Sequence, residues 1–421
     1  MDRHGFLERT GLTFAAAALA STPAWFPDEA GADAAADVRT WRGVRAQFRL
    51  RRDLVHLGTF LLASHPKPVR DSIARHRAGL DRNTVDYLHG KGPVLEAAVL
   101  RAAASYLGAS PAEIALTDST TMGLGTLYTG LAVRAGQELL TTEHDFFATH
   151  ASLREKARRS GASVRRVRLY EPGDEVTEQQ LVDRLLAGVS DRTRVVAITW
   201  VHSSTGVKLP IRRIGDALAA TNATRDPADR ALLCVDGVHG LGVEDVTAPG
   251  LGCDFLIAGT HKWLFGPRGT GLVWARSAAW SQASPTIPSF SGDSTFGAVM
   301  TPGGFHSFEH RWALGSAFRF HERVGKARVE ARIHSLARQF KEGLAAIPRV
   351  RLVTPRSDAV AAGLVCFEVA GLPPRAVVSR LRANRIVATE TPYNPSYARV
   401  GPGMLNTPAD VRRALAAIRA L

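Results

Sequence analysis

The sequence predicts an α/β protein whose large domain holds a mainly parallel, doubly wound sheet. Between about residues 113 and 274, short apolar runs alternate with stretches of helical periodicity. That alternation is typical of a parallel sheet covered by helices on both faces. The predicted strands lie at 113–117, 138–142, 164–169, 194–200, 232–235, 254–258 and 271–274. The predicted helices between them lie at 122–133, 147–160, 177–187 and 211–220.

The composition along the chain divides it into three parts. Residues 1–37 read as a leader and linker, and residues 38–300 as a mainly helical N-terminal segment followed by the large domain. A Pro/Ser/Gly-rich stretch at 284–304 ends that part. Residues 301–421 predict a smaller α+β domain. It should hold a helix over about 312–345, strands near 364–369 and 398–400, and a closing helix over 408–421.

The first residues have the layout of an export signal. Residues 1–9 are charged, residues 12–20 are apolar, and the small residues at 21–24 suit cleavage. The start resembles the twin-arginine export motif, with Arg3 present and His4 in place of the second arginine. We therefore expect export to the periplasm, with an uncleaved cytoplasmic protein as the alternative. No segment is long and apolar enough to predict a membrane span.

The charge of the chain is strongly positive, at +14 from 53 basic and 39 acidic residues. Only seven of the basic residues are lysines, and the arginines are scattered over helical patterns rather than gathered in a stripe with aromatics. We expect a solvated surface and no nucleic-acid partner. The three cysteines, Cys234, Cys253 and Cys366, stand singly in apolar runs, which predicts buried free thiols and no metal site.

An acid and a lysine follow two of the predicted strands. Asp236 comes directly after the run 232–235, and Lys262 follows the run 255–258. Ligands of such sheets bind at the carboxyl ends of strands. A lysine amine can form a Schiff base with the aldehyde of pyridoxal 5'-phosphate, and a carboxylate can keep the pyridine nitrogen protonated. Either residue alone would predict a helix cap or a surface side chain, but together they suit this cofactor, with Lys262 as the catalytic lysine.

Two motifs resemble the cofactor region of the class V aminotransferase-fold enzymes, a family that includes epimerase-like, cysteine desulfurase and kynureninase branches. They are 235–239 (Val-Asp-Gly-Val-His) and 261–269 (His-Lys-Trp-Leu-Phe-Gly-Pro-Arg-Gly). The resemblance covers about residues 50–421 and is closest to the isopenicillin N epimerase-like branch. It implies the fold type I of pyridoxal-phosphate-dependent transferases, the cofactor itself and a homodimer.

Two segments are expected to hold the cofactor phosphate. Thr120 and Thr121 follow a predicted strand and open a helix, where backbone N–H groups and hydroxyls bind phosphate. A simple helix cap is the alternative for them. The resemblance also implies that Thr260 and His261 lie near the phosphate, although this chain has Gly259 where the family often has serine.

The resemblance assigns three more residues to the cofactor ring. His144 would stack on the ring and relay protons, as both a catalytic and a cofactor-binding residue, unless it is a structural histidine at a strand end. His239 would donate a hydrogen bond to the ring oxygen. Ser203 stands where cysteine desulfurases carry an asparagine near that oxygen.

Arg399 is the candidate for substrate binding. It matches the arginine of the family's Arg…Asn-Thr motif, completed here by Asn406 and Thr407, and a guanidinium suits bidentate binding of an α-carboxylate. A structural ion pair is the alternative. Desulfurases use another arginine, at the place of Thr389. Residues 308–312 stand where relatives carry a Gly-Thr that reaches the partner's phosphate, so His310 or Arg311 could replace that contact.

These residues predict a pyridoxal-phosphate enzyme that acts at the α-carbon of a small-molecule substrate, either an amino acid or an amine. Transamination is the first expectation, and epimerisation or C–S lysis stays open. Cys366 lies in an apolar run and not in a mobile loop, which argues against a persulfide-forming desulfurase. A nucleotide-binding dehydrogenase would need a Gly-x-Gly-x-x-Gly motif that is missing after the first strand. A degenerate, non-catalytic binding protein is the alternative from another class.

Overall fold

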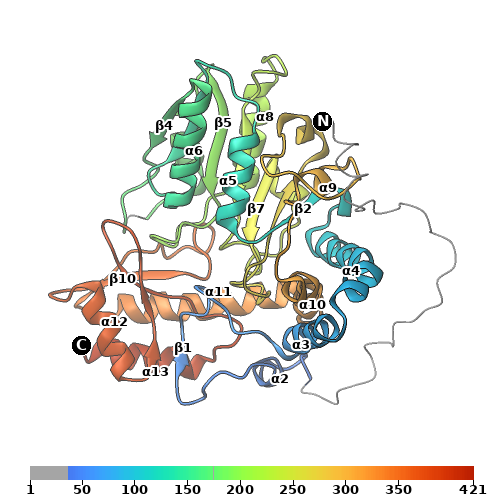
Figure 1. Ribbon diagram of the computed structural model, residues 1–421. Coiled ribbons are helices and arrows are strands. Elements are labelled where there is room, and N and C mark those ends of the chain that lie inside the picture. The colour runs from blue at the N-terminus through green and yellow to red at the C-terminus, as the bar shows by residue number, and fades with distance from the viewer. Residues whose placement is uncertain (1–36, 174) are drawn as a thin grey trace.

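The computed structural model describes residues 37–173 and 175–421 (Figure 1). The predicted export leader therefore lies outside the described residues, apart from Asp37 at its end. In Figure 1 a central sheet with its helices stands above a second body, in which α11 (Lys326–Ala345) runs almost horizontally. None of the helices in the described ranges combines the length and the hydropathy needed to cross a bilayer.

The central sheet has seven strands in the order β2-β8-β7-β6-β5-β3-β4. Strand β8 pairs antiparallel with β2 and β7, and the other pairs are parallel, so the predicted mainly parallel sheet is confirmed. The strand bounds are β2 Ile114–Thr117, β3 Glu138–Thr142, β4 Ser163–Val167, β5 Thr193–Thr199, β6 Leu232–Asp236, β7 Phe255–Gly259 and β8 Gly271–Ala275. Only the edge strand β4 is largely exposed.

Each face of this sheet is covered by its own apolar core. Along β6, Leu233 and Val235 belong to one buried cluster, whereas Leu232 and Cys234 belong to another. Because successive side chains of a strand point to opposite faces, this alternation shows that both faces are buried. The helices that follow the strands are α5 Thr120–Gly130, α6 Phe147–Ser160, α7 Glu178–Leu186 and α8 Ile211–Asn222.

The second sheet is antiparallel, in the order β12-β13-β10-β9. Its strands are β9 Val350–Leu352, β10 Val365–Val369, β12 Thr389–Glu390 and β13 Ala398–Val400. Helices α11, α12 (Pro374–Ala383) and α13 (Pro408–Arg419) pack with it around a separate apolar core. Helix α12 and strand β9 were not among the predicted elements.

The single helix predicted for residues 312–345 is wrong, because the structure has two helices there. Helix α10 (Phe308–Val324) ends at Gly325, and α11 begins directly after it. Gly325 has φ +94, a conformation that L side chains rarely adopt and that glycine tolerates. Both helices are amphipathic, so their apolar pattern continues across the break and hides it in the sequence.

The N-terminal region joins the two bodies. Its helices are α2 Trp41–Ala46, α3 Lys67–Arg82 and α4 Thr84–Leu107, and its strand β1 (Val55–His56) pairs with β11 (Ile386–Val387). Beyond β1, the carbonyl of Leu57 accepts from Gly401 N at 2.7 Å, and Ala63 N donates to the carbonyl of His261 at 2.9 Å. Residues 57–63 therefore contact the loop that carries the predicted catalytic lysine.

Candidate active site

The predicted acid and lysine meet at the carboxyl edge of the central sheet. Asp236 is the last residue of β6, and Lys262 follows the neighbouring strand β7 by three residues. The loop that holds Lys262 is closed at its base, because Thr260 N donates to Thr270 O at 3.1 Å. The Thr260 and Thr270 hydroxyls also lie 2.5 Å apart. The lysine is thus carried by a short loop tied to two strands.

Lys262 is half-buried and weakly bonded. Its Nζ lies 3.4 Å from Nε2 of His239, the one hydrogen-bond partner of this amine within the described residues. Burial lowers the pKa of Lys262 to about 8, although the charge of Asp236 opposes the shift. A large fraction of the amine is therefore neutral at mildly basic pH, which is the form that attacks a carbonyl.

His239 is oriented by the tryptophan of the His-Lys-Trp motif, to which the sequence analysis assigned no role. Trp263 Nε1 donates to Nδ1 of His239 at 3.1 Å. Burial and the nearby Lys262 hold the pKa of His239 well below its usual value, so the ring is neutral. Because Nδ1 accepts, the proton is assigned to Nε2, which faces Lys262. His239 therefore offers a fixed donor beside the lysine, as its predicted bond to the ring oxygen requires.

Asp236 lies almost fully inside the protein. One of its carboxylate oxygens accepts from Val238 N at 3.0 Å. Burial raises the pKa of Asp236 to about 6, and the charge of Lys262 only partly opposes this. A buried carboxylate of this kind favours any cation placed beside it, such as a protonated pyridine nitrogen.

His144 is stacked on an aromatic ring. Its imidazole lies 3.8 Å from the ring of Tyr170, with 7° between the planes. Its Nε2 accepts from Leu169 N at 3.2 Å, and burial lowers its pKa to about 3, with His202 adding to the shift. Tyr170 covers one face of His144, so only the opposite face is available to a cofactor ring.

A buried network that the sequence analysis missed supports Tyr170 from behind. Its hydroxyl lies 2.8 Å from His202 Nδ1 and 2.7 Å from Thr205 Oγ1. Asp145 lies at the far side of His202 and accepts from Thr142 N and Thr199 N. These residues come from three different strand ends, and no local sequence pattern links them.

The residues predicted to bind the cofactor phosphate lie around the start of α5. Ser119 caps this helix by accepting from Met122 N at 3.1 Å, and the Thr120 hydroxyl accepts from Gly259 N at 2.7 Å. Thr121 is exposed at the helix start, whereas the Thr260 hydroxyl points inward to Thr270. Among the contacts in the described ranges, buried His261 Nδ1 has no hydrogen-bond partner.

Steric crowding explains why residue 259 is glycine where the family often has serine. A Cβ at Gly259 would lie 2.8 Å from the Thr120 hydroxyl and 3.0 Å from His261 Cε1. The close approach of these two side chains leaves no room for a larger residue. An unpartnered buried imidazole nitrogen beside a helix N-terminus fits a phosphate group, so the donors present here fit the predicted cofactor.

Arg399 is buried without an acidic partner among the described residues. Its Nη1 donates to the Ser203 carbonyl at 2.8 Å and its Nε to the Thr389 hydroxyl at 3.2 Å. The guanidinium lies over the ring of Phe60 at 4.8 Å, and burial lowers its pKa. The structural ion pair considered from the sequence is therefore not formed. Instead, a buried cation held by neutral groups suits an anionic ligand.

A tyrosine that the sequence analysis missed stands beside this cation. The hydroxyls of Tyr393 and Ser203 lie 2.7 Å apart, and burial raises the pKa of Tyr393 beyond its usual range. Tyr393 lies between Pro392 and Pro395 in the loop before β13. The two prolines beside an aromatic residue were a local signal for a rigid loop that could have identified it.

One residue proposed from the sequence is occupied within its own chain. Arg311 is buried and pairs with Glu96 at 3.3 Å and with Asp118 at 3.4 Å. Its neighbour His310 contacts the carbonyl of Arg268 through Nδ1 at 2.9 Å. Arg311 is therefore not free for a partner's phosphate, and His310 is held by a backbone carbonyl of its own chain.

The fold and this edge of the sheet define a class of protein: an α/β enzyme with a lysine and a buried acid at neighbouring strand ends. The sequence model of the family described as aminotransferase class-V matches residues 94–391, and the chain belongs to this family. Isopenicillin N epimerase from Streptomyces clavuligerus is 25% identical over 409 residues, covering 91% of this chain and 99% of the relative. A probable cysteine desulfurase 2 from Mycobacterium leprae is 27% identical over 286 residues, covering 64% and 65%.

Solved structures show the same fold. A lysine-to-alanine variant of the C–S lyase C-DES, with glycine covalently linked to its pyridoxal-phosphate cofactor, aligns with a TM-score of 0.79. It is 21% identical, and the alignment covers 89% of this chain and 98% of that one. The apo cysteine desulfurase from Thermococcus onnurineus NA1 aligns with a TM-score of 0.77 at 21% identity, over 90% and 97%.

Proposed function

We propose that the protein is a pyridoxal-phosphate enzyme that acts at the α-carbon of an amino acid. The observation that carries this proposal is the position of the half-buried Lys262 near Asp236 and His239 at neighbouring strand ends, with its pKa lowered to about 8. The family and the shared fold support the cofactor. When bound, that cofactor supplies an electron sink for charge that develops at the substrate α-carbon.

The residues around the cofactor would have different roles. His261, Thr121 and the start of α5 would hold the phosphate, with the Thr120 hydroxyl and Thr260 shaping the loop beside it. His144 would cover one ring face, because its own far face is already covered by Tyr170. Asp236 would hold a proton on the ring nitrogen, and His239 Nε2–H would donate to the ring oxygen. Lys262 would bind the cofactor aldehyde and then move the α-proton as a general base.

Substrate binding falls to Arg399. Its guanidinium bonds only to the Ser203 carbonyl and the Thr389 hydroxyl in the described residues, which leaves donors for an α-carboxylate. The hydroxyls of Ser203 and Tyr393 lie close enough to add further donors. Arg399 therefore takes the role that the desulfurases give to an arginine at the place of Thr389. An α-amino acid is favoured over a simple amine, because an amine would leave this cation unpaired.

For the reaction we propose transamination first and epimerisation second. Epimerisation is favoured by one observation: the isopenicillin N epimerase relative matches over 99% of its own length. C–S lysis stays a third outcome of the same proton abstraction. Persulfide formation by this chain is opposed by Cys366, which is buried in β10 and whose pKa burial raises to about 12.

Spectra and products together test this function. The purified protein with added pyridoxal phosphate should be yellow, and borohydride should fix the cofactor to Lys262. Incubation with single amino acids in D₂O should then exchange the α-hydrogen. A 2-oxo acid indicates transamination, loss of optical rotation indicates epimerisation, and sulfide from cysteine or cystine indicates C–S lysis. A protein that stays colourless would instead support a non-catalytic binding protein.

We also propose a homodimer. Large apolar side chains are exposed on one face, with Phe305 at 80% and Phe290 at 46% exposure. They line a hollow of about 600 Å³ between α4, α10 and residues 289–306, together with Trp312. Exposed apolar surface of this kind marks an interface, and here the partner is a second copy. Light scattering should give twice the chain mass, and Phe305→Glu should reduce it whereas Val246→Glu should not.

Export through the predicted leader is the remaining proposal. It rests on the layout of residues 1–37 alone. N-terminal sequencing of the protein from cell fractions tests it. A periplasmic form that begins near Ala24 supports export, and an intact Met1 confined to the cytoplasm would refute it.

A further inference from the structure

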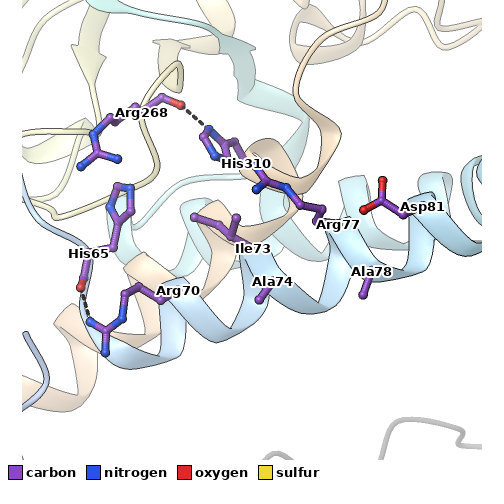
Figure 2. A pocket seen from close by; sticks show the side chains of 9 residues that line it. All are labelled: His65, Arg70, Ile73, Ala74, Arg77, Ala78, Asp81, Arg268 and His310. Carbon is purple, nitrogen blue, oxygen red and sulfur yellow. Dashed lines mark hydrogen bonds between the residues drawn. The ribbon is translucent and has the colours of Figure 1, made fainter. Parts of the chain in front are cut away.

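A basic pocket lies between α3 and the end of the loop that carries Lys262. It has a volume of about 390 Å³ and is bordered by α3, the loop end at Arg268, and the start of α10. Its charged and titratable lining consists of His65, Arg70, Arg77, Asp81, Arg268 and His310 (Figure 2). Three arginines and two histidines therefore face one aspartate.

His65 shows that the pocket lacks a partner. Its side chain is 8% exposed, and neither ring nitrogen has a hydrogen-bond partner in the described part of the chain. Figure 2 shows the ring standing beneath Arg268. Burial lowers the pKa of His65 to about 4, and the charges of Arg268 and His310 act in the same direction. Buried polar atoms without partners are rare in proteins, and an absent water or ion is one of their causes.

The arginines are incompletely neutralised. Arg70 donates to two backbone carbonyls, those of Gln47 at 2.8 Å and His65 at 2.6 Å, which leaves its charge in place. Arg77 has an exposed and loose contact with Glu309 at 3.5 Å. The guanidinium of Arg268 has no carboxylate partner among the described residues, and its carbonyl holds His310 in place. The net charge of the lining is therefore positive.

We propose that this pocket binds a small multivalent anion with carboxylate or phosphate groups. Arg77 and Arg268 would provide the guanidinium donors, and His65 would provide the buried donor between them. The site is distinct from the proposed cofactor phosphate site, whose donors lie at His261 and the start of α5. Lys262 and Arg268 lie at the two ends of one loop, so an anion held here would also steady the loop that carries the lysine.

Calorimetric titration of the pyridoxal-phosphate-loaded protein tests the pocket, because the cofactor fills the other phosphate site. Inorganic pyrophosphate and citrate are the probes, and they separate phosphate from carboxylate recognition. We expect one binding event per chain for at least one probe. Arg268→Gln and His65→Gln should each weaken it about tenfold, as the loss of one charge-assisted bond predicts. Arg213→Gln, on the exposed face of α8, should leave it unchanged.

Three results would overturn the proposal: no binding of either probe, equal weakening by the Arg213→Gln control, or full affinity in Arg268→Gln and His65→Gln. Arg77→Gln, an exposed position on α3, is a second variant that keeps the fold intact. If the protein takes up no pyridoxal phosphate, the proposed function fails, but the titration still applies. In that case the titration is repeated in a His261→Gln variant, which lacks a donor of the cofactor phosphate site. The effect of the pocket variants on probe binding then tests the pocket.

Discussion

Lys341 is buried and Lys262 is half-buried, and the protein holds the two amines in opposite ways. Lys341, on α11, donates to the carbonyls of Pro355 at 3.3 Å and Arg356 at 2.7 Å and to the carboxylate of Asp358 at 3.0 Å. Its three protons are therefore matched by three acceptors. Lys262 has a single long contact with His239. The acceptors around Lys341 favour its charged form, although burial still lowers its pKa, whereas Lys262 has no such set of acceptors and is left free to react.

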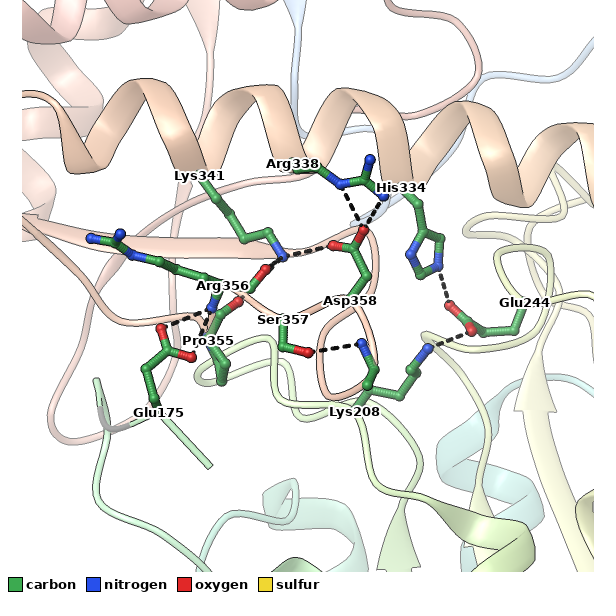
Figure 3. Close-up of polar contacts among 11 residues, drawn as sticks. Glu175, Lys208, Glu244, His334, Arg338, Lys341, Pro355, Arg356, Ser357 and Asp358 are labelled. Carbon is green, nitrogen blue, oxygen red and sulfur yellow. Dashed lines mark hydrogen bonds and ion pairs between the residues drawn. The ribbon is translucent and has the colours of Figure 1, made fainter. Parts of the chain in front are cut away.

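The same difference extends to the surroundings of the two lysines. Lys341 belongs to a junction cluster of Lys208, Glu244, His334, Lys341 and Asp358 (Figure 3). In this cluster Glu244 pairs with Lys208 at 2.8 Å and with His334 at 2.7 Å. Burial alone would raise the pKa of Glu244, but these two partners outweigh it and lower the value. Each charge of the cluster meets an opposite one.

The candidate active site leaves its charged groups incompletely paired. The pKa of Asp236 is raised, the pKa of Lys262 is lowered, and Arg399 has no acid beside it among the residues that the structure describes. Burying charges in this way costs stability. Groups that a fold keeps at such a cost mark places where a ligand completes the pairing.

The largest expected effect comes from Lys262→Ala. It should remove the yellow colour and lower turnover by about 100- to 10,000-fold, because the general base and the cofactor attachment are both lost. Its thermal midpoint should not fall below that of the apo wild type, since a poorly paired buried amine is removed. Circular dichroism and absorbance spectra measure both. Cofactor that borohydride still fixes covalently to the Lys262→Ala protein would show that another lysine holds it.

Lys341→Met should act on stability alone. Removing one partner of a buried pair costs about 3 kcal/mol, the lower end of the usual range because Arg338 still pairs with Asp358. Urea denaturation should show this loss, while the cofactor spectrum and KM stay unchanged. If Lys341→Met impaired turnover as strongly as Lys262→Ala does, the contrast between the two lysines would be wrong.

Asp236→Asn should stabilise the cofactor-free protein. The pKa of Asp236 is about 6 in the folded chain against the ordinary aspartate value of 3.8, so its ionisation lowers the stability as the pH rises from about 4 to 6, and the full loss is present above that. A shift of this size corresponds to about 3 kcal/mol, and the gain should vanish as the pH falls below 4, where both states hold the proton. Denaturation at pH 7 and pH 4 provides the comparison. The holoenzyme should lose activity in the same variant.

Arg399→Gln should raise KM for α-amino acids about 30-fold, the loss of roughly 2 kcal/mol of charge-assisted binding. Turnover at saturation should change less. Arg338→Gln, an exposed arginine next to the junction cluster, is the matched control and should leave KM unchanged. An unchanged KM in Arg399→Gln would contradict substrate binding by this residue and would favour a structural role.

The smallest effect concerns pH. Because the pKa of Lys262 is about 8, the neutral amine that captures the cofactor increases about tenfold between pH 7 and pH 9. Stopped-flow absorbance should show the capture rate rising over this range and levelling above it. A rate that is flat from pH 7 upward would mean that the amine is already neutral.

The sequence predicted the parts of the site that are set by single strands. Apolar runs placed Asp236 and Lys262 at strand ends, and parallel pairing then brought them together. His144 and Arg399 were found through family motifs at their own strands. For these residues the local sequence pattern also fixes the position in the fold, so they can be predicted from the sequence.

What the sequence could not show depends on contacts between distant loops. Tyr170 reaches His144 only because β4 lies next to β3, and Tyr393 reaches Ser203 across 190 positions. The bond from Trp263 that sets the proton of His239 joins two loops of different strands. The break at Gly325 was hidden for another reason, because its backbone angle leaves no trace in the apolar pattern.

The segment 57–63 has a consequence for how the protein is made. It contacts Gly401, near the end of the chain, and His261, beside the lysine. Arg399 lies in the last strand, over the ring of Phe60 from that same segment. A ribosome must therefore finish nearly the whole polypeptide before the pocket can close, although domains usually fold in order of synthesis. Cofactor loading is expected as a late, post-translational event, and nascent chains that stop short of residue 399 should not bind it.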